Sequence, residues 1–264
     1  MASRNPLFNI GRMIDETMKD VPIETSFIED LNRTIVKMNE RSTNPSKTYK
    51  PSSLTCVRNM YYQVTGRDID EGSSTTPELC GICESGTDRH LRIQECVSQM
   101  KNYGVDCEYI DVGKYVEDNN IPDIKVIGKN GAETRLYNSR LNISFLCDGI
   151  IRYKGKYYIL EIKTESSYKW RERTYVDDSH IPQAIAYSLN LCIDDVLFLY
   201  ECRDLCSKKC YLYTVTDQLR KEVLDTIKSC DDYVSIGVVP MKPQTVSKKT
   251  CQYCQYRKSC KMDG

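Results

Sequence analysis

Residues 141–164 read LNISFLCDGIIRYKGKYYILEIKT, and this stretch decides the fold of the chain. Two runs of β-branched and aromatic side chains, which are typical of strands, lie on either side of the dipeptide Lys154-Gly155. A glycine in the second of these positions suits a two-residue hairpin turn, because such turns need a positive φ. The stretch therefore predicts a β-hairpin, with one strand over residues 143–153 and the other over residues 156–163.

The turn also fixes which residues face each other across the hairpin. If Tyr153 pairs with Lys156, then Asp148 lies directly opposite Glu161. Two carboxylates in that arrangement have Cβ atoms about 5 Å apart and repel each other. Lys163 follows Glu161 by two residues and points to the same face. The pattern favours a divalent-metal site with a lysine beside it, although the same side chains would also fit the solvated face of an amphipathic hairpin.

Length and composition narrow the classes of protein to consider. The chain has 264 residues, enough for one large domain or two small ones, and its 37 Lys and Arg balance its 37 Asp and Glu. A nucleic-acid-binding surface would therefore have to be a local patch. No segment approaches the roughly 18 apolar residues of a membrane span, and the first residues lack the apolar core of a signal peptide. We expect a cytoplasmic protein that does not enter a membrane.

Helical spacing of apolar residues recurs twice within residues 1–50, which predicts a helical N-terminal appendage. The main core is expected over residues 51–240, and a cysteine-rich tail over residues 241–264. Within the core, further strands are expected over residues 195–201 and 209–215, and a helix over residues 217–236.

The cysteines are numerous and unevenly spaced. There are 14, and in a reducing compartment closely spaced cysteines more often bind metal than form disulfides. Cys251, Cys254 and Cys260 form a C-x2-C-x5-C pattern in a short, poorly hydrophobic tail, which indicates metal or cluster binding. Spacing alone does not identify the fourth ligand. The basic neighbours Lys248 and Lys249 would favour thiolates, and they could also contact a phosphate backbone.

Two expected helices carry residues that suit a catalytic site. His90 lies on a helix expected over residues 81–103. A lone helical histidine is more often structural, but the chain has only 2 histidines, so an imidazole ligand has few sources. The helix expected over residues 181–191 places Gln183 and Tyr187 at i and i+4, on one face.

A polar segment after the hairpin has the composition of a nucleic-acid contact. It contains Lys169, Trp170, Arg171 and Arg173. Cations beside an exposed tryptophan suit a phosphate backbone and base stacking. A solvated loop explains the same composition equally well.

These motifs follow one another in an order that resembles the RecB-like nucleases of the PD-(D/E)XK superfamily. The resemblance is strongest to the iron–sulfur branch, which includes CRISPR-associated exonucleases, the AddB nuclease domain and related phage exonucleases. Gly86 and His90 match the family's G-x3-H helix. Asp148 matches the aspartate of the next core strand, and Glu161 and Lys163 match the E-x-K strand.

The helix that follows matches the family's Q-x3-Y pattern through Gln183 and Tyr187, and the match spans about residues 52–260. The resemblance implies an α/β (α+β) fold of the restriction-endonuclease type. Its mixed central sheet would be flanked by helices, with an iron–sulfur-bound C-terminal tail.

The resemblance also implies a site for Mg²⁺ or Mn²⁺ with catalytic side chains around it. The implied metal ligands are His90, Asp148, Glu161 and the backbone carbonyl of Ile162. The implied catalytic residues are Asp148, Glu161, Lys163, Gln183 and Tyr187. In such a site Lys163 would orient or deprotonate the attacking water or neutralise charge on the phosphate, and Gln183 and Tyr187 would hold Lys163 and the phosphate in place.

One upstream cysteine and three at the C-terminus hold a [4Fe–4S] cluster in this branch. By resemblance the ligands here would be Cys56, Cys251, Cys254 and Cys260. The implied activity is metal-dependent exonuclease hydrolysis of single-stranded DNA or duplex ends. The implied partners are DNA and proteins of recombination, repair or CRISPR adaptation.

The chain departs from the family pattern at several positions. Cys147 stands where many relatives have proline before the aspartate, and Phe145 stands where many have glycine. Five further cysteines have no role in the pattern: Cys80, Cys83, Cys202, Cys206 and Cys210.

Three other functions fit parts of the sequence. A structure-specific endonuclease would use the same site. A non-catalytic nucleic-acid-binding protein could keep an inert nuclease fold, although the complete set of Asp148, Glu161 and Lys163 argues against it. A zinc-dependent regulatory protein is supported only by the number of cysteines.

Overall fold

The computed structural model describes residues 22–39, 47–70, 76–130 and 133–264. The chain divides into two compact units, one of Met1–Ser42 with Ser74–Cys83 and one of Thr43–Ser73 with Glu84–Gly264. The first helical pattern of the expected appendage lies outside the described residues. The second pattern forms α2 (Ile23–Met38), which buries none of its residues. None of the described helices is long and apolar enough to span a membrane.

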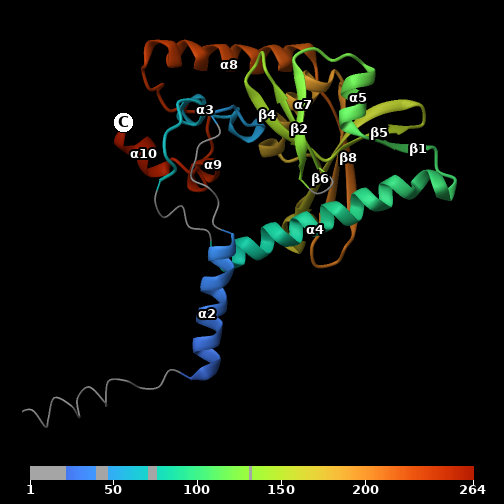
Figure 1. The fold of residues 1–264 in the computed structure, drawn as a ribbon, viewed down its shortest axis with the longest axis horizontal. Coiled ribbons are helices and arrows are strands. Elements are labelled where there is room, and N and C mark those ends of the chain that lie inside the picture. Colours follow the sequence, from blue (N-terminus) through green and yellow to red (C-terminus); the bar gives the residue numbers. More distant parts are fainter. Residues whose placement is uncertain (1–21, 40–46, 71–75, 131–132) are drawn as a thin grey trace, which may run out of the picture. The chain divides into compact units, whose positions relative to one another are not determined.

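The second unit is built on a five-stranded sheet (Figure 1). Its strands, in spatial order, are β1 (Cys107–Ile110), β5 (Gly149–Tyr153), β6 (Lys156–Glu165), β7 (Asp195–Cys202) and β8 (Lys208–Thr214). Neighbouring strands are antiparallel except β6 and β7, which are parallel. The sheet is therefore mixed, as the resemblance implied.

A second sheet of three antiparallel strands contains β2 (Ile124–Asn130), β3 (Glu133–Asn138) and β4 (Ile143–Cys147). The prediction of one strand over residues 143–153 is therefore wrong. The strand is interrupted at Asp148, where the chain leaves one sheet and enters the other, so that β4 and β5 belong to different sheets. The break coincides with two side chains, Gln94 and Tyr109, that donate hydrogen bonds to the backbone carbonyl of Asp148.

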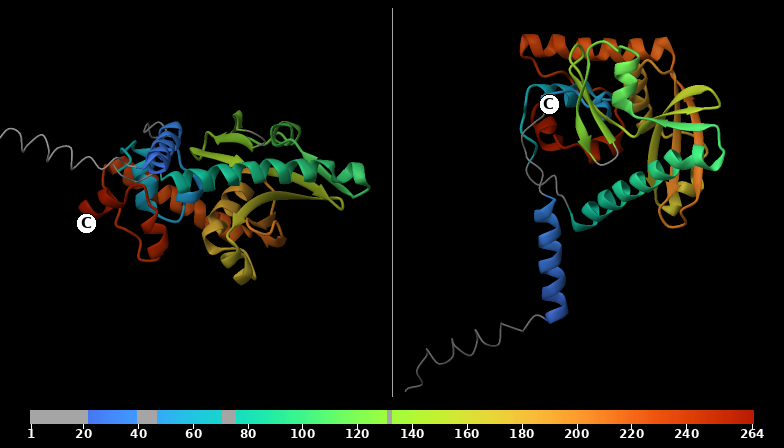
Figure 2. Two further views of the ribbon diagram at one scale, coloured as in Figure 1. Left: turned by 90° about the horizontal axis from the view of Figure 1, so that it is seen from below. Right: turned by 45° about the vertical axis from the view of Figure 1, so that its right-hand side comes forward.

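Helices cover both faces of the five-stranded sheet. On one face, Ile93 of α4 (Pro77–Gln99) packs with Leu160 and Ile162 of β6. The other face is covered by α7 (Ile181–Leu191), which packs on β6 and β7, and α8 (Asp217–Ile236) packs beside α7 and α3 (Val57–Val64) (Figure 2). The remaining described helices are α5 (Val112–Asp118), α6 (Ser167–Glu172), α9 (Lys248–Gln252), α10 (Arg257–Met262) and the 3-10 turns η1 (Pro51–Ser53), η2 (Met100–Tyr103) and η3 (Asp178–His180).

The sequence predicted no helix at α5, α6, α9 or α10. At α6 the sequence fitted a nucleic-acid contact or a solvated loop, whereas in the structure the backbone N–H of Ser167 donates to Asp204 Oδ2 at 2.8 Å and fixes the first turn of a helix. Because Asp204 lies in the turn between β7 and β8, this stabilisation comes from tertiary structure. At α5 the Asp111 side chain accepts from the N–H of Lys114, an N-terminal cap that the sequence analysis missed.

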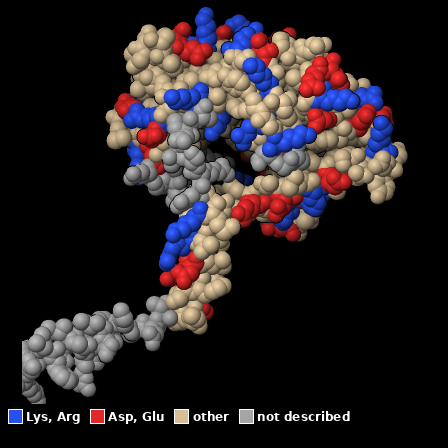
Figure 3. Space-filling view, viewed as in Figure 1, with Lys and Arg blue, Asp and Glu red and all other residues tan. Residues whose placement is uncertain are grey.

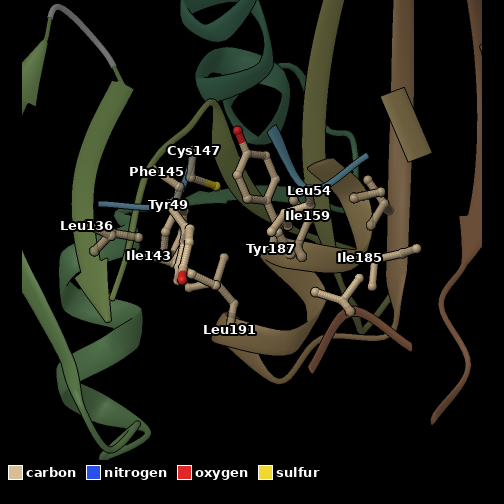
Figure 4. Close-up of a cluster of buried hydrophobic side chains, with 14 of the residues drawn as sticks. Tyr49, Leu54, Leu136, Ile143, Phe145, Cys147, Ile159, Ile185, Tyr187 and Leu191 are labelled. Carbon is tan, nitrogen blue, oxygen red and sulfur yellow. The ribbon is translucent and has the colours of Figure 1, made fainter. Parts of the chain in front are cut away.

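The main core lies between α7 and both sheets, and the five-stranded sheet contributes residues of its inner strands β5, β6 and β7 (Figure 4). Tyr187 extends from α7 into this cluster and lies beside Cys147, the last residue of β4. The Phe145 ring packs against Tyr187 with ring centroids 5.4 Å apart. The phenylalanine and cysteine that depart from the family pattern are thus buried packing residues.

The cysteine-rich tail packs against α3 (Figure 2). Asp70 accepts hydrogen bonds from the backbone N–H and the hydroxyl of Ser259, at the start of α10. Asp263 accepts from Tyr62 at 2.7 Å and pairs with Arg67 at 2.6 Å. Polar contacts therefore hold the last helix in place beside the cysteines.

Candidate active site

Three side chains from separate elements converge at the break between β4 and β5. His90 comes from α4, Glu133 is the first residue of β3, and Asp148 is the break itself. Nδ1 of His90 lies 3.2 Å from Asp148 Oδ1 and 3.6 Å from Glu133 Oε1. One ligand atom from each residue lies within 4.8 Å of the others, the only such group of three among the described residues. An imidazole and two carboxylates at these distances form a candidate metal site.

Asp148 is held from several directions. Its Oδ2 accepts a hydrogen bond of 2.6 Å from the backbone N–H of Ile162. Its backbone carbonyl accepts from Gln94 at 2.5 Å and from the Tyr109 hydroxyl at 2.7 Å. The Tyr109 ring fills the space beside the next residue, where a Cβ on Gly149 would lie 2.6 Å from Cε2 of the ring. A glycine is therefore required after the aspartate for Tyr109 to reach it.

A chain of hydrogen bonds runs from Glu161 to the core. Lys163 pairs with Glu161 Oε1 and donates to Gln183 Oε1 at 2.9 Å. Gln183 in turn donates to the Tyr187 hydroxyl at 2.5 Å, and Tyr187 donates to the backbone carbonyl of Leu146. Spacing on α7 brings the glutamine and the tyrosine to one face, as the sequence predicts. The lysine is thereby fixed between a carboxylate and an amide.

The charge states of these groups follow from burial and from one another. Burial opposes charge on His90, but hydrogen bonds with Asp148 and Glu133 outweigh it and raise the pKa of the imidazole to about 10. Burial also favours the neutral acid at Asp148, yet contacts with His90 and the charge of Lys163 lower the pKa of that carboxyl. In the absence of metal, an imidazolium therefore lies between two carboxylates.

The second acid behaves differently. Burial, together with the charge of Asp148, raises the pKa of Glu161 to about 7, although Lys163 opposes the shift. Burial acts to lower the pKa of Lys163, but Glu161 and Asp148 raise it above the ordinary value. Without metal the Lys163 side chain is therefore protonated, and it cannot accept a proton from the attacking water. Oε2 of Glu161 is buried and has no hydrogen-bond partner.

The predicted hairpin register is confirmed from the pair Tyr153–Lys156 up to the pair Gly149–Leu160. The ladder ends there, one pair before Asp148 and Glu161. Asp148 bonds to the backbone of Ile162, so the expected direct opposition of the two acids is not found.

Sequence reasoning missed Glu133. It is the first residue of β3, and an acidic residue at the start of a strand carries no distinctive pattern. The available signal was the position of β3 beside β4, which brings the start of one strand close to the end of the other; Thr134 pairs with Cys147. Recognising it requires the register of that sheet.

The four cysteines that the resemblance assigns to a cluster line one cavity of about 620 Å³: Cys56, Cys251, Cys254 and Cys260. Burial and neighbouring thiols raise the pKa of Cys56 and of Cys254. Asn59 Nδ2 lies 3.7 Å from Cys254 Sγ, and Arg58 Nη1 lies 3.6 Å from Cys260 Sγ. Residues nearly 200 positions apart are therefore brought to one place.

The segment expected to contact nucleic acid is partly engaged within the protein. Trp170 is half-buried rather than exposed, and Lys209 lies 4.3 Å from its ring centroid. Arg173 pairs with Glu165 and, at 3.0 Å, with Asp177. Lys169, Arg171 and Lys248 are exposed, while the Lys249 side chain lies outside the described part of the structure.

Comparisons with known proteins give structural similarity only. No family model and no curated protein matches the chain. The structure of SSO0001 is 14% identical, with a TM-score of 0.46, over 89% of this chain and 96% of that chain. An alkaline exonuclease (LHK-Exo) from Laribacter hongkongensis is 11% identical, with a TM-score of 0.44, over 78% of this chain and 93% of its own.

LHK-Exo in complex with dAMP is 12% identical, with a TM-score of 0.45, over 82% of this chain and 95% of that chain. All three TM-scores lie below 0.5, so the assignment of a function depends on the geometry of the site itself.

Proposed function

We propose that this chain is a metal-dependent deoxyribonuclease that removes nucleotides from single-stranded DNA or duplex ends. The supporting observation is the convergence of His90, Glu133 and Asp148 within 4.8 Å, beside the Glu161–Lys163 pair. A cluster of acids with a fixed ammonium provides both a place for a hard cation and a positive charge for a phosphate.

The residues present fit Mg²⁺ or Mn²⁺. Three carboxylates and one ammonium leave the site with two excess negative charges once His90 loses its proton, which matches a divalent ion. Oε2 of Glu161 is buried without a partner and would gain one. We propose that His90, Asp148 and Glu133 hold the ion. Glu161 and the backbone carbonyl of Ile162, the other ligands that the resemblance implies, would complete the site. When bound, the metal would lower the pKa of a water and stabilise charge on the phosphate.

The side chains of this protein would supply the rest of the chemistry. Lys163 stays charged, so it would neutralise a non-bridging oxygen of the phosphate or orient the water by donating to it. Gln183 fixes the ammonium at 2.9 Å, and Tyr187 fixes Gln183 at 2.5 Å. These bonds keep the Lys163 ammonium group in place before DNA binds, so the site needs little reorganisation.

We also propose that Cys56, Cys251, Cys254 and Cys260 hold a [4Fe–4S] cluster with a structural role. All four cysteines line one cavity of about 620 Å³, which brings the upstream cysteine to the three of the tail. N–H donors from Arg58 and Asn59 suit cluster sulfurs.

Exposed cations support DNA as the substrate. Figure 3 shows several Lys and Arg side chains near a hollow on the face in view. Lys169, Arg171 and Lys248 are the exposed cations that we propose to contact the phosphate backbone.

The test is the digestion of single-stranded DNA, labelled at either end, by protein purified without oxygen, with Mg²⁺ or Mn²⁺. We expect mononucleotides or short products from one end, and no cleavage by Lys163→Ala. The nuclease proposal would be refuted if the DNA stays intact both with Mg²⁺ and with Mn²⁺. Lys163→Ala cleaving as fast as the parent would refute the catalytic role of the lysine.

Two further measurements separate the related proposals. Closed circular single-stranded DNA should resist the enzyme, and rapid cutting of the circle would indicate an endonuclease. Protein purified without oxygen should be brown, absorb near 400 nm as Fe–S proteins do, and contain iron. A colourless protein with bound zinc would contradict the cluster. Cys254→Ala should lose the colour, whereas Cys192→Ala, at an exposed cysteine, should keep it.

A further inference from the structure

A polar pocket of about 540 Å³ lies where α3, η3 and the cysteine-rich tail approach one another, and no residue of the proposed reaction lines it. All of its lining residues belong to the second unit of the chain. Those that matter here are Lys50, Asn59, Gln63, Asp177, Ser179 and Tyr253.

Two amide side chains in this pocket have oxygen atoms without partners. Gln63 is only 6% exposed, and its Oε1 is buried without a hydrogen bond. Oδ1 of Asn59 is likewise buried and unpaired, while its Nδ2 faces Cys254. The two residues are four apart on α3, so they share one face. Buried polar atoms without partners are unfavourable, so an N–H donor bound in the pocket would stabilise both oxygen atoms.

The pocket is also close to the reacting groups. Ser179 of η3 lines the pocket, and α7 begins two residues later. Gln183, which fixes Lys163, follows Ser179 by four residues, across the junction of η3 and α7. The pocket and the acceptor of the lysine thus lie at the same end of α7, where a DNA strand with its phosphate at Lys163 would place a neighbouring base.

We propose that this pocket binds one nucleobase of the DNA strand, next to the phosphate that is cleaved; this inference rests on the proposed function. Every nucleobase presents at least one N–H group on its pairing edge, which would donate to the oxygen atom of Asn59 or Gln63. The Tyr253 ring is 77% exposed at the pocket wall and offers a stacking surface, and the exposed Lys50 offers a charge for the adjoining phosphate.

Other occupants fit less well. An apolar peptide side chain would leave both amide oxygens unpaired. A metal ion would need several carboxylates, and the lining has two, Asp177 and Asp178. Asp177 already accepts from the N–H of Ser179 at 3.0 Å with one oxygen and from Arg173 at 3.0 Å with the other, which leaves Asp178 alone.

The test compares the full-length parent with Gln63→Met, which keeps the size of the side chain and removes the amide. Fluorescence anisotropy would measure the binding of single-stranded oligonucleotides of about 12 nucleotides, with EDTA present so that no cleavage occurs. One abasic site would be moved along the strand. For the parent we expect affinity to fall about tenfold when the abasic site occupies one particular position.

For Gln63→Met we expect about tenfold weaker binding of the intact strand and no further loss from the abasic site at that position. Gln218→Met, which changes an exposed amide on α8, should behave like the parent. Gln63→Met should also unfold at the same temperature as the parent or higher, because it removes an unpaired buried oxygen. Weaker binding could then not be attributed to unfolding.

Two results would overturn the pocket proposal. In one, the parent binds every abasic strand equally. In the other, Gln63→Met keeps the position-dependent loss. Because binding is measured without metal, the outcome is independent of catalysis. A parent that shows the base effect but cleaves no DNA with Mn²⁺ would refute the nuclease function and leave the pocket standing.

Discussion

The backbone N–H of Ile162 donates a hydrogen bond of 2.6 Å to Oδ2 of Asp148, and this contact joins the break between two sheets to the strand that carries Glu161 and Lys163. The other oxygen of Asp148 faces His90 at 3.2 Å. The carboxylate is thus oriented by a strand on one side and a helix on the other. Its rotation is fixed, so a cation placed between Asp148 and His90 would meet a preformed ligand.

Glu133 gives the first prediction. If it is a metal ligand, Glu133→Gln should weaken Mn²⁺ binding by about 10- to 100-fold, because a charged ligand is replaced by a neutral one. Isothermal titration calorimetry on metal-free protein would measure the change. Glu117→Gln, on the helix α5, is the matched control and should bind as the parent does. Equal affinity of Glu133→Gln and the parent would show that the ion is held without this residue.

The hairpin register could be predicted from the local sequence, whereas the position of Glu133 in the site could not. The Lys154-Gly155 turn fixes pairs up to Gly149–Leu160 because each pair is set by its neighbour. The pairing stops at Asp148, because the side chains of Gln94 and Tyr109, which belong to other elements, donate hydrogen bonds to its backbone carbonyl. No turn or period in the sequence carries this information.

The helix α7 and the segment around Trp170 illustrate the same division. Periodicity predicted α7 and the shared face of Gln183 and Tyr187, since spacing within one helix determines both. The half-buried state of Trp170 could not be predicted, because it depends on Lys209 from a strand almost 40 residues later. Local pattern thus predicted elements and their faces, while the contacts between elements required the structure.

Gln183 gives the second prediction. Gln183→Met removes the acceptor of the Lys163 ammonium but keeps the volume of the side chain. We expect kcat for DNA hydrolysis to fall by about 10- to 100-fold with little change in KM, because the lysine loses its fixed position in the transition state. Steady-state kinetics with Mn²⁺ would measure both constants. Gln218→Met controls for the substitution itself, and an unchanged kcat for Gln183→Met would mean that Lys163 is positioned by Glu161 alone.

The pKa values in the site give the third prediction. Without metal, burial raises the pKa of Glu161 to about 7, and hydrogen bonds with Asp148 and Glu133 overcome the effect of burial and raise that of His90 to about 10. Both groups must lose a proton to act as ligands, so Mn²⁺ affinity should rise between pH 6 and pH 8, by about tenfold per pH unit for each proton released. Calorimetry in buffers of different ionisation enthalpy would count the protons.

In Glu161→Gln the number of protons released on binding should fall by about one at pH 6. An affinity that stays constant from pH 6 to pH 8 would contradict the charge states described for the metal-free site.

Glu201 gives the fourth prediction, on stability. Its side chain is fully buried, and it pairs with Arg89 at 2.8 Å, Arg92 at 2.5 Å and Lys208 at 3.0 Å. Burial favours the neutral acid, but these three cations lower the pKa of the carboxyl. Glu201→Gln should therefore reduce the free energy of unfolding by about 3 kcal/mol near pH 7, since it leaves the cations without their shared partner.

The sign of the pH dependence follows from the lowered pKa. The stabilisation is present above the ordinary glutamate pKa of about 4.3 and is lost as the pH falls through the lower folded-state value. Urea unfolding of the parent and of Glu201→Gln should therefore converge on acidification below about pH 4. A difference that stays constant down to pH 3 would contradict this account.

The two glycines beside the site give the fifth prediction, because they look alike in the sequence and differ in the structure. A Cβ on Gly149 would lie 2.6 Å from Cε2 and 2.7 Å from the hydroxyl of Tyr109, so Gly149→Ala must displace either the ring or the Asp148 break. We expect a loss of about 1–3 kcal/mol in unfolding free energy and a marked loss of cleavage.

A Cβ on Gly86 would meet only Thr164 Oγ1, at an ordinary 3.8 Å. Gly86→Ala should therefore stabilise α4 by about 0.5–1 kcal/mol and leave cleavage unchanged, although Gly86 belongs to the G-x3-H pattern. Thermal unfolding and DNA digestion of both variants would decide, and equal effects of the two substitutions would show that the Tyr109 ring does not determine the position of Asp148.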